Sequence, residues 1–405
     1  MTIAMVYREV GTCGGIQRGA SFQVDQFRGW GYDPVVLTEK DLGHDAGRMD
    51  RLAAILRERQ IDLVIEHDAY SEEKLSADIS ASRSAEVPIV VFWHSVFSWM
   101  IAQANSRVLK IFPLLKQADA LITLSKTDEA FFRLLGCRAF AIPYCDADLM
   151  GGFERREYPH RILWMGGRFN DWKRPCDAVR VLAGVREKIP DAELLLLGDG
   201  NPKERSVLEN CLGKYPAIRQ AVRCLGFQKD VRPYLEMAGV GLVTSKFEGF
   251  CHSVIEMKMA SLPVVSYAMP YLPTLEPNTG AIVVPQCDVT AAAHAIAELW
   301  GSPDECRRQG DRARQSYEAL RAFDERLAYE RLFAAVEDPA SNYGREPVSE
   351  EWAASAVATL LEHCVAGWSV AERRGASSVR KELAFRLGRA LLLPVRLLRK
   401  LSVRR

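Results

Sequence analysis

The sequence has no long apolar run and no recognisable export signal. Its longest apolar runs, such as PIVVFW and ALLLPV, fall far short of the ~18–20 residues that a membrane-spanning helix needs. The first residues, MTIAMVYREV, lack the basic-then-apolar pattern of a secretory signal. We therefore expect a cytoplasmic protein.

Several common site motifs are missing too. The ten cysteines include no CxxC pair and no run at metal-ligand spacing, so we expect reduced core residues and no bound metal. A GxGxxG fingerprint with its acidic partner is absent, which argues against a nicotinamide site. No nucleophile elbow, pyridoxal-phosphate lysine or nucleic-acid-binding module is recognisable, so we expect no cofactor and no nucleic-acid partner.

The composition is that of a globular protein with more than one domain. The chain has 405 residues, of which 48% are hydrophobic and 26% charged. At roughly 100–200 residues per domain, this length suits two domains and an appendage. The content of apolar residues is sufficient for full cores.

Charge is unevenly distributed along the chain. The net charge is +1, but residues 371–405 carry eleven Lys/Arg and two Asp/Glu, a net of +9, which leaves −8 (+1 − 9) for residues 1–370. From Leu383, apolar residues follow helical spacing while Arg386, Arg389, Arg396 and Lys400 fall on another face, although Pro394 interrupts the pattern. Residues 380–405 therefore either bind an anionic membrane surface or pack on the acidic body or a partner protein.

Short continuous apolar runs alternate with helical patterns, which is typical of parallel sheets covered on both faces. TIAMVY, DPVVLT, IDLVIEHD, PIVVFWH, ALITLS and AFAIPY form a first series, and RILWMGG, AELLLLGDG, AVRCLGF, VGLVTS, LPVVSY and GAIVVP a second. We predict an α/β protein with two Rossmann-like domains facing across a cleft, and a helical basic C-terminal appendage. The predicted bounds are 1–157, 158–315, helices returning to the first domain over 316–344, and a tail over 345–405.

Ligands bind open parallel sheets beyond the carboxyl ends of the strands, so the residues after each strand are candidates. GTCGGIQR follows the first strand, and Gly14, Gly15 and Arg18 could approach a phosphate or sugar closely. MGGRFNDWKR opens the second series, where Arg168 and Lys173 could converge on one anion. The alternatives are a tight strand-to-helix turn and solvated surface charges.

The most informative stretch is FEGFCHSVIE, which places Glu248 and Glu256 where a strand gives way to a helix. Ser253 and Glu256 fit a capping box, a purely structural alternative that leaves Glu248 unexplained. Carboxylates are poor phosphate ligands but good acceptors for hydroxyl groups. Two acids flanking a helix N-terminus that could bind phosphate therefore indicate a nucleotide sugar, which has hydroxyls on both sides of a diphosphate.

These motifs together resemble the retaining glycosyltransferases of family 4, within glycosyltransferase group 1, which have the GT-B fold. FEGFCHSVIE is similar to the family's Glu, seven residues, Glu signature, and DVRPYLEMAGVGLVTS, ASLPVVSY, GGR…K and GGIQR resemble family segments in the same order. The similarity covers approximately residues 1–335.

The resemblance implies roles for individual residues. Arg168 and Lys173 would hold the donor diphosphate, Glu256 the ribose hydroxyls, and Glu248 the transferred sugar. His94 matches the family histidine near the reaction centre. The remaining donor-binding candidates are Gly14, Gly15, Arg18, Gly167, Gly249, Phe250, Cys251, His252 and Ser253.

The expected activity is hexosyl transfer from a nucleotide-diphosphate sugar, with retention and without a metal, to a lipid-linked or surface saccharide. This activity would serve polysaccharide biosynthesis at the cell envelope, with the enzyme peripheral on the inner membrane face. An Asp-Ala-Asp run, Asp146 to Asp148, could be a metal site but is expected to be a turn. A GT-B nucleotide-sugar epimerase and a catalytically silent scaffold remain alternatives. The stretch YAMPYLPTLEPNTG departs from the family's pattern, so one donor-sugar contact is left unassigned.

Overall fold

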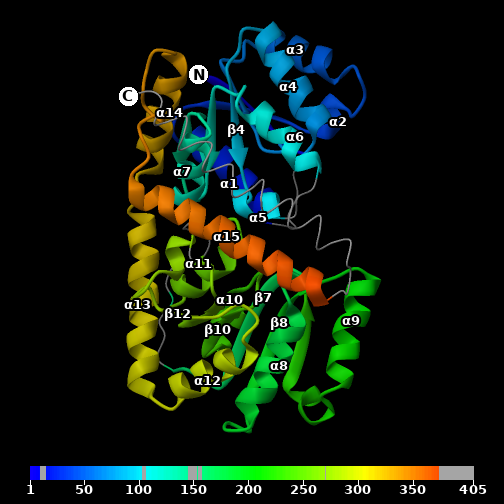
Figure 1. Cartoon of the computed structure of the whole chain (residues 1–405), viewed down its shortest axis with the longest axis vertical. Coiled ribbons are helices and arrows are strands. Elements are labelled where there is room, and N and C mark those ends of the chain that lie inside the picture. The colour runs from blue at the N-terminus through cyan, green and yellow to red at the C-terminus, as the bar shows by residue number, and fades with distance from the viewer. Residues whose placement is uncertain (10–14, 103–105, 145–152, 154–156, 270, 374–405) are drawn as a thin grey trace. The chain divides into compact units, whose positions relative to one another are not determined.

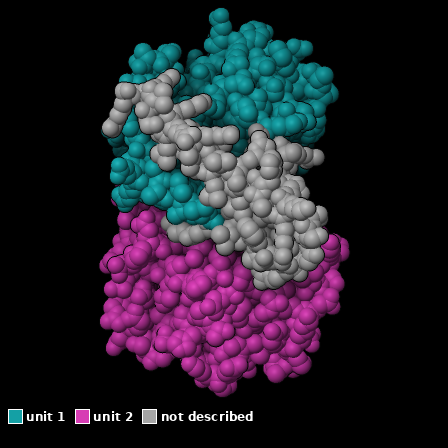
Figure 2. All heavy atoms as spheres, in the orientation of Figure 1, with its two compact units in different colours: residues 1–144, 324–405 teal, residues 145–323 magenta. Residues whose placement is uncertain are grey.

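The computed structural model describes residues 1–9, 15–102, 106–144, 153, 157–269 and 271–373. It divides into two compact units, residues 1–144 with 324–405 and residues 145–323, coloured separately in Figure 2. Each unit is an α/β structure built on one parallel sheet (Figure 1). The predicted fold class, a pair of Rossmann-like domains, is confirmed.

The first unit has a six-stranded sheet in the order β2-β1-β3-β4-β5-β6 within the described residues. The strands are continuous apolar runs, and β3 and β4 are buried along their whole length, as expected for a sheet covered on both faces. The strands are β1 Thr2–Val6, β2 Asp33–Leu37, β3 Leu63–Glu66, β4 Ile89–Trp93, β5 Ala120–Thr123 and β6 Ala139–Ala141.

Helices connect these strands and two more return from the far end of the chain. Ser71 and Ser125 each cap a helix start by accepting a backbone N–H, which fixes where α4 and α7 begin. The helices are α1 Gly15–Gly29, α2 Glu39–Leu42, α3 Arg48–Glu58, α4 Glu72–Ser84, α5 Phe97–Ala102, α6 Ser106–Leu115, α7 Lys126–Leu134, α14 Glu325–Glu337 and α15 Glu350–Arg373.

The returning helices are part of the first unit's core. In α14, Tyr329 packs edge-on against Phe27 of α1 with ring centroids 4.9 Å apart. In α15, the His363 ring nitrogen lies 2.6 Å from the Ser98 hydroxyl of α5, and Leu360 is buried in the same core. The last described helix is therefore integrated into the unit, whereas residues 374–405, most of the predicted basic tail, lie outside the described residues.

The second unit has its own six-stranded sheet, in the order β12-β11-β10-β7-β8-β9 over the described residues. Its strands are β7 Arg161–Arg168, β8 Glu193–Asp199, β9 Val222–Gly226, β10 Val240–Val243, β11 Val264–Tyr267 and β12 Ala281–Val284. Its helices are α8 Pro175–Arg186, α9 Pro202–Gly213, α10 Arg232–Met237, α11 His252–Met259, α12 Val289–Trp300 and α13 Pro303–Arg321, with 3₁₀ turns η1 Pro216–Ala221 and η2 Pro273–Leu275.

The strand order determines which loops meet in this unit. β10 lies between β7 and β11, and all of these pairings are parallel. The loops after β7, β10 and β11 therefore leave the same edge of the sheet side by side. These loops, together with the end of β7 and the start of α11, contain most of the residues singled out in the sequence.

The burial of the cysteines and the apolarity of the helices bear on two of the expectations from sequence. Cys224 and Cys287 are exposed, so the expectation that the cysteines are core residues is wrong for these two, while Cys137, Cys211, Cys251 and Cys306 are buried. Among the described residues, no helix is both long and apolar enough to span a bilayer.

Candidate functional site

The loop after β7 brings a pair of cations to the sheet edge. Gly167 has φ +68°, a left-handed conformation that disfavours other residues, and a register shift interrupts the pairing with β8 at this point. A side chain at Gly166 would collide with the Trp164 ring, since its Cβ would lie 2.0 Å from that ring. The glycine pair thus lets β7 bend beneath the bulky indole and end at Arg168, which is exposed.

Lys173 lies further along this loop and forms an ion pair with Glu248. Its Nζ is 2.6 Å from Glu248 Oε1, and the two side chains are 23% and 11% exposed. Burial acts to lower the pKa of Lys173, but attraction to Glu248 outweighs it, so the pKa is raised and the ammonium form is favoured. Repulsion from the nearby Arg168 guanidinium opposes that rise.

Thr244, just after β10, links the two loops. Its hydroxyl accepts a hydrogen bond from Trp164 Nε1 at 2.9 Å. The same hydroxyl lies 2.8 Å from the Lys173 carbonyl and 2.9 Å from the Arg174 carbonyl, to which it donates. The backbone carrying Lys173 is therefore held against the end of β10.

Glu248 is positioned by a residue from the next loop. Its backbone N–H donates to the Tyr271 hydroxyl at 3.0 Å, and Tyr271 is buried. Tyr271 belongs to the stretch that departs from the family's sequence pattern. In this chain the stretch thus supports the Glu248 loop.

Gln286, after β12, forms hydrogen bonds with residues of the loops after β7, β10 and β11. Its side-chain Nε2 lies 3.2, 3.3 and 2.9 Å from the carbonyls of Ser245, Lys246 and Ala268, and its Oε1 accepts from Arg174 at 3.0 Å. Neither Gln286 nor Tyr271 was identified in the sequence, because their importance depends on which loops become neighbours.

The helix that follows Glu248 starts in a different way from the capping box considered above. Cys251 is the N-cap of α11 with φ +67°, and its side chain makes no capping hydrogen bond. Ser253 is consequently the second helical residue, and its hydroxyl lies 3.5 Å from Cys251 Sγ. The capping-box interpretation is wrong, so Glu256 is not held at the helix start by that motif.

The start of α11 is suited to an anion. No acidic residue occupies its first turn. The first N–H groups of a helix lack intrahelical partners and carry partial positive charge. Phe250 is buried beneath the turn, while Gly249, His252, Ser253 and Glu256 are partly exposed.

His94 belongs to the first unit, directly after β4, and is 8% exposed. Its Nε2 lies 3.0 Å from His67 Nδ1, and its Nδ1 lies 2.9 Å from the Tyr144 hydroxyl. Burial, and then the neighbouring His94, lower the pKa of His67 well below its usual value, so His67 is neutral. The structure thus places His94 in a buried chain of hydrogen bonds that the sequence did not reveal.

Glu66, the last residue of β3, directly precedes His67, the first member of this hydrogen-bonded series. Burial and then repulsion from Asp78 raise its pKa well above that of an ordinary carboxyl group. Glu66 and His67 are 1% and 2% exposed, so both side chains are buried at the end of β3.

Some of the predicted site lies at the limits of the described residues. Gly15 and Arg18 are in the first turn of α1, and Gly14 lies outside the described residues, as does the Asp146 to Asp148 run. Within the described part of the chain, no three His, Cys, Asp or Glu side chains are grouped to hold a metal ion.

The chain is similar to known proteins in sequence and in fold. Residues 154–316 match the family model of glycosyl transferases group 1. An uncharacterized glycosyltransferase of Methanocaldococcus jannaschii is 33% identical over 100 residues, which are 25% of this chain and 24% of the relative. The match therefore spans about a quarter of either protein.

Solved structures share the fold over most of the chain. Anabaena HepE in complex with UDP has a TM-score of 0.65 at 16% identity, covering 83% of this chain and 100% of that one. The pneumococcal O-GlcNAc transferase GtfA, in complex with UDP and GlcNAc, has a TM-score of 0.67 at 11% identity, covering 83% of this chain and 98% of that one. Sucrose-phosphate synthase of Thermosynechococcus elongatus has a TM-score of 0.66 at 20% identity, covering 82% of this chain and 99% of that one. Residues 154–316 thus match glycosyl transferases group 1, in a chain whose two α/β units share the fold of these solved structures.

Proposed function

We propose that this chain is a glycosyltransferase that moves a hexosyl group from a nucleotide-diphosphate sugar to a saccharide acceptor, with retention of configuration. The observation that carries the proposal is the Lys173–Glu248 ion pair, 2.6 Å long. It joins a predicted diphosphate ligand to a predicted sugar ligand from loops 75 residues apart in sequence. The group 1 match over residues 154–316 and the UDP named with two of the solved structures support the donor class.

The proposed donor site neutralises the leaving group. Arg168 and Lys173 are proposed to bind the diphosphate together with the N–H groups at the start of α11. An ammonium has three donor hydrogens, so the bond to Glu248 leaves donors on Lys173 for phosphate oxygens. Fixed positive charge stabilises the negative charge that develops as the diphosphate departs.

The two acids are proposed to recognise hydroxyl groups on either side of that diphosphate. Glu248 would accept from the transferred sugar and Glu256 from the ribose. The remaining predicted donor-binding residues, including Gly14, Gly15 and Arg18, keep that role in the proposal. His94 is proposed to act near the reaction centre.

The test is nucleoside diphosphate release from a panel of nucleotide sugars, stimulated by saccharide acceptors. Lys173→Gln should lower the rate about 10²–10³-fold, because one preorganised donor to the developing charge is lost. Lys246→Gln is the matched control, since Lys246 pairs with Asp171 on the same loops without a proposed role in the site. Equal loss in both variants, or unchanged turnover in Lys173→Gln, would contradict the proposed site.

A panel result also separates the alternatives. Interconversion of sugars without release of nucleoside diphosphate would indicate an epimerase, and binding without reaction a scaffold. Metal independence is tested by comparing turnover in EDTA with turnover in added Mg²⁺ or Mn²⁺. Strict dependence on the metal would overturn that part of the proposal.

The acceptor is proposed to be lipid-linked or a growing surface saccharide, with the enzyme peripheral on the cytoplasmic membrane face. This step rests on the basic composition of residues 380–405. It predicts that a saccharide on a lipid carrier in anionic vesicles is a better acceptor than the same saccharide free in solution.

A further inference from the structure

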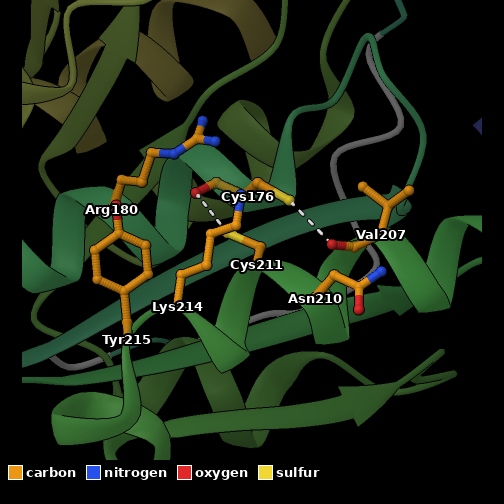
Figure 3. A pocket seen from close by; sticks show the side chains of 7 residues that line it. All are labelled: Cys176, Arg180, Val207, Asn210, Cys211, Lys214 and Tyr215. Atoms are coloured by element: carbon orange, nitrogen blue, oxygen red, sulfur yellow. Dashed lines mark hydrogen bonds between the residues drawn. The ribbon is translucent and has the colours of Figure 1, made fainter.

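The second unit contains a cavity whose lining includes none of the site residues described above. It has a volume of about 410 Å³ and lies beside α8 and α9 (Figure 3). Its lining includes two cysteines, Cys176 and Cys211, together with Arg180, Lys214 and Tyr215. None of these residues has a role in the proposed transfer reaction.

Cys176 and Cys211 are in contact although they are 35 residues apart. Cys211 Sγ lies 3.8 Å from the Cys176 carbonyl oxygen, and Cys176 Sγ lies 3.9 Å from the Val207 carbonyl oxygen, as the dashed lines in Figure 3 mark. Both cysteines are free thiols. Cys211 is 6% exposed and Cys176 is half-buried, so the cavity is the route by which a small molecule reaches them.

The surroundings of the pair favour one thiolate. Interaction with the Cys176 side chain, followed by the positive charges of Arg180 and Lys214, lowers the pKa of Cys211 to about 7 despite the opposing effect of burial. The same interaction correspondingly raises the pKa of Cys176. One thiol is thus prepared to attack and the other remains protonated beside it, which is the arrangement of an attacking and a resolving cysteine.

We propose that Cys211 and Cys176 form a thiol–disulfide exchange site that takes a small anionic disulfide into the cavity. The Cys211 thiolate attacks one sulfur of the disulfide, forming a mixed disulfide and releasing one thiolate. Cys176 then loses its proton, attacks Cys211 Sγ and releases the second thiolate, which leaves a Cys176–Cys211 disulfide. The added disulfide is reduced to two thiols as the protein dithiol is oxidised, so atoms and electrons balance.

The charge at the cavity argues for an anionic substrate. Arg180 and Lys214 are both exposed, and Arg180 also forms an ion pair with Asp177. Carboxylates of a substrate can bind these cations while its disulfide reaches the thiols. Oxidised glutathione has this chemistry and is the probe.

The experiment treats the full-length protein with oxidised glutathione across pH 5.5–8.5, followed by alkylation and peptide mapping. We expect Cys211 to react about tenfold faster than exposed Cys224 below pH 7. The thiolate fraction of Cys211 is larger than that of Cys224 by about two orders of magnitude, but a thiolate of lower pKa is a weaker nucleophile, which offsets about one of them. The product should be a Cys176–Cys211 disulfide that dithiothreitol reverses. Faster reaction at Cys224 or Cys287, with both proposed cysteines recovered as thiols, would overturn the proposal.

Two variants assign the steps without relying on loss of reaction alone. Cys176→Ser should stop at a glutathione adduct on Cys211, because no resolving thiol remains. Lys214→Gln should slow glutathione entry but leave reaction with neutral hydroxyethyl disulfide nearly unchanged. A Cys176→Ser protein that accumulates no adduct, or equal slowing of both disulfides by Lys214→Gln, would contradict the proposed roles.

Discussion

His67 is a neutral, buried residue whose ring nitrogen contacts that of His94. Its ring also stacks on that of Tyr7, with the two ring centroids 4.2 Å apart. His67→Phe should keep the stacking but remove the hydrogen bond that orients His94. We expect slower turnover with unchanged UDP binding, because Arg168 and Lys173, the proposed diphosphate ligands, belong to the other unit. Acceptor-dependent turnover and a UDP thermal-shift titration measure the two quantities.

The control for this prediction is Tyr7→Phe. It keeps the ring beside His67 and removes only the hydroxyl, which bonds Gln23 at 3.4 Å. Turnover should stay close to that of the wild type. If His67→Phe also behaves like the wild type, His67 has no positioning role.

Lys258, on α11, is a second buried titratable group, and its side chain is completely enclosed. Burial lowers its pKa from 10.5 to about 7, against the attraction of Glu276. Between these two pH values the unfolded chain binds the proton that the folded chain has released. Stability from this residue therefore rises with pH in that window, by up to about 1.4 kcal/mol per pH unit.

Lys258→Met should remove this slope while nearly conserving side-chain volume. The substitution also removes the hydrogen bonds that Lys258 Nζ donates to the Thr274 carbonyl and, at 3.1 Å, to the Ser316 hydroxyl, which lowers stability. Urea unfolding of both proteins at pH 7, 8 and 9 gives the difference in slope. Parallel stability curves would show that Lys258 does not titrate in this range.

Among the elements, β7 depends most directly on a single small residue. A methyl group at Gly166 would lie 2.0 Å from the Trp164 ring, and that indole is buried and bonded to Thr244. Gly166→Ala should destabilise the unit by about 1–3 kcal/mol, as overpacking does. It should also weaken UDP binding, because Arg168 ends the same strand.

Gly213→Ala is the matched control for β7. Gly213 is the last residue of α9, and an added Cβ there meets nothing within 4 Å. Denaturation midpoints and UDP titrations compare the two variants. Similar midpoints would mean that Trp164 moves aside without cost.

The strands could be predicted from sequence because each is a short, continuous apolar run followed by turn residues. The start of α11 could not, since Ser253 and Glu256 satisfy the capping-box spacing whether the helix begins at Ser253 or at His252. The left-handed backbone of Cys251 selects the second start. That choice depends on how the loop packs over the sheet edge, which local sequence does not encode.

The same reasoning applies to the candidate site. Arg168, Lys173 and Glu248 could be selected because they follow strands, but their pairing required β7 and β10 to be neighbours. Tyr271 and Gln286 support those loops from β11 and β12, and neither is part of a recognisable motif. Supporting residues of this kind become visible only when strand order is known.

At the scale of the whole chain, the acidic body and basic end suggest that residues 374–405 have a partner of their own. Truncation after Arg373 is a clean test, because it keeps every described residue of α15, including the buried Ala356, Leu360 and His363. We expect the truncated protein to unfold at the same temperature as the full chain and to release nucleoside diphosphate equally fast with a soluble acceptor.

The full chain should pellet with vesicles containing anionic phospholipid, and the truncated protein should not. Each basic residue near an anionic surface contributes roughly 1 kcal/mol, and this attraction weakens as salt is raised. Neutral phosphatidylcholine vesicles and high salt should therefore both release the full chain. Equal pelleting of the two proteins would exclude the tail as a membrane ligand, whereas a lower melting temperature on truncation would show that the tail packs on the body instead.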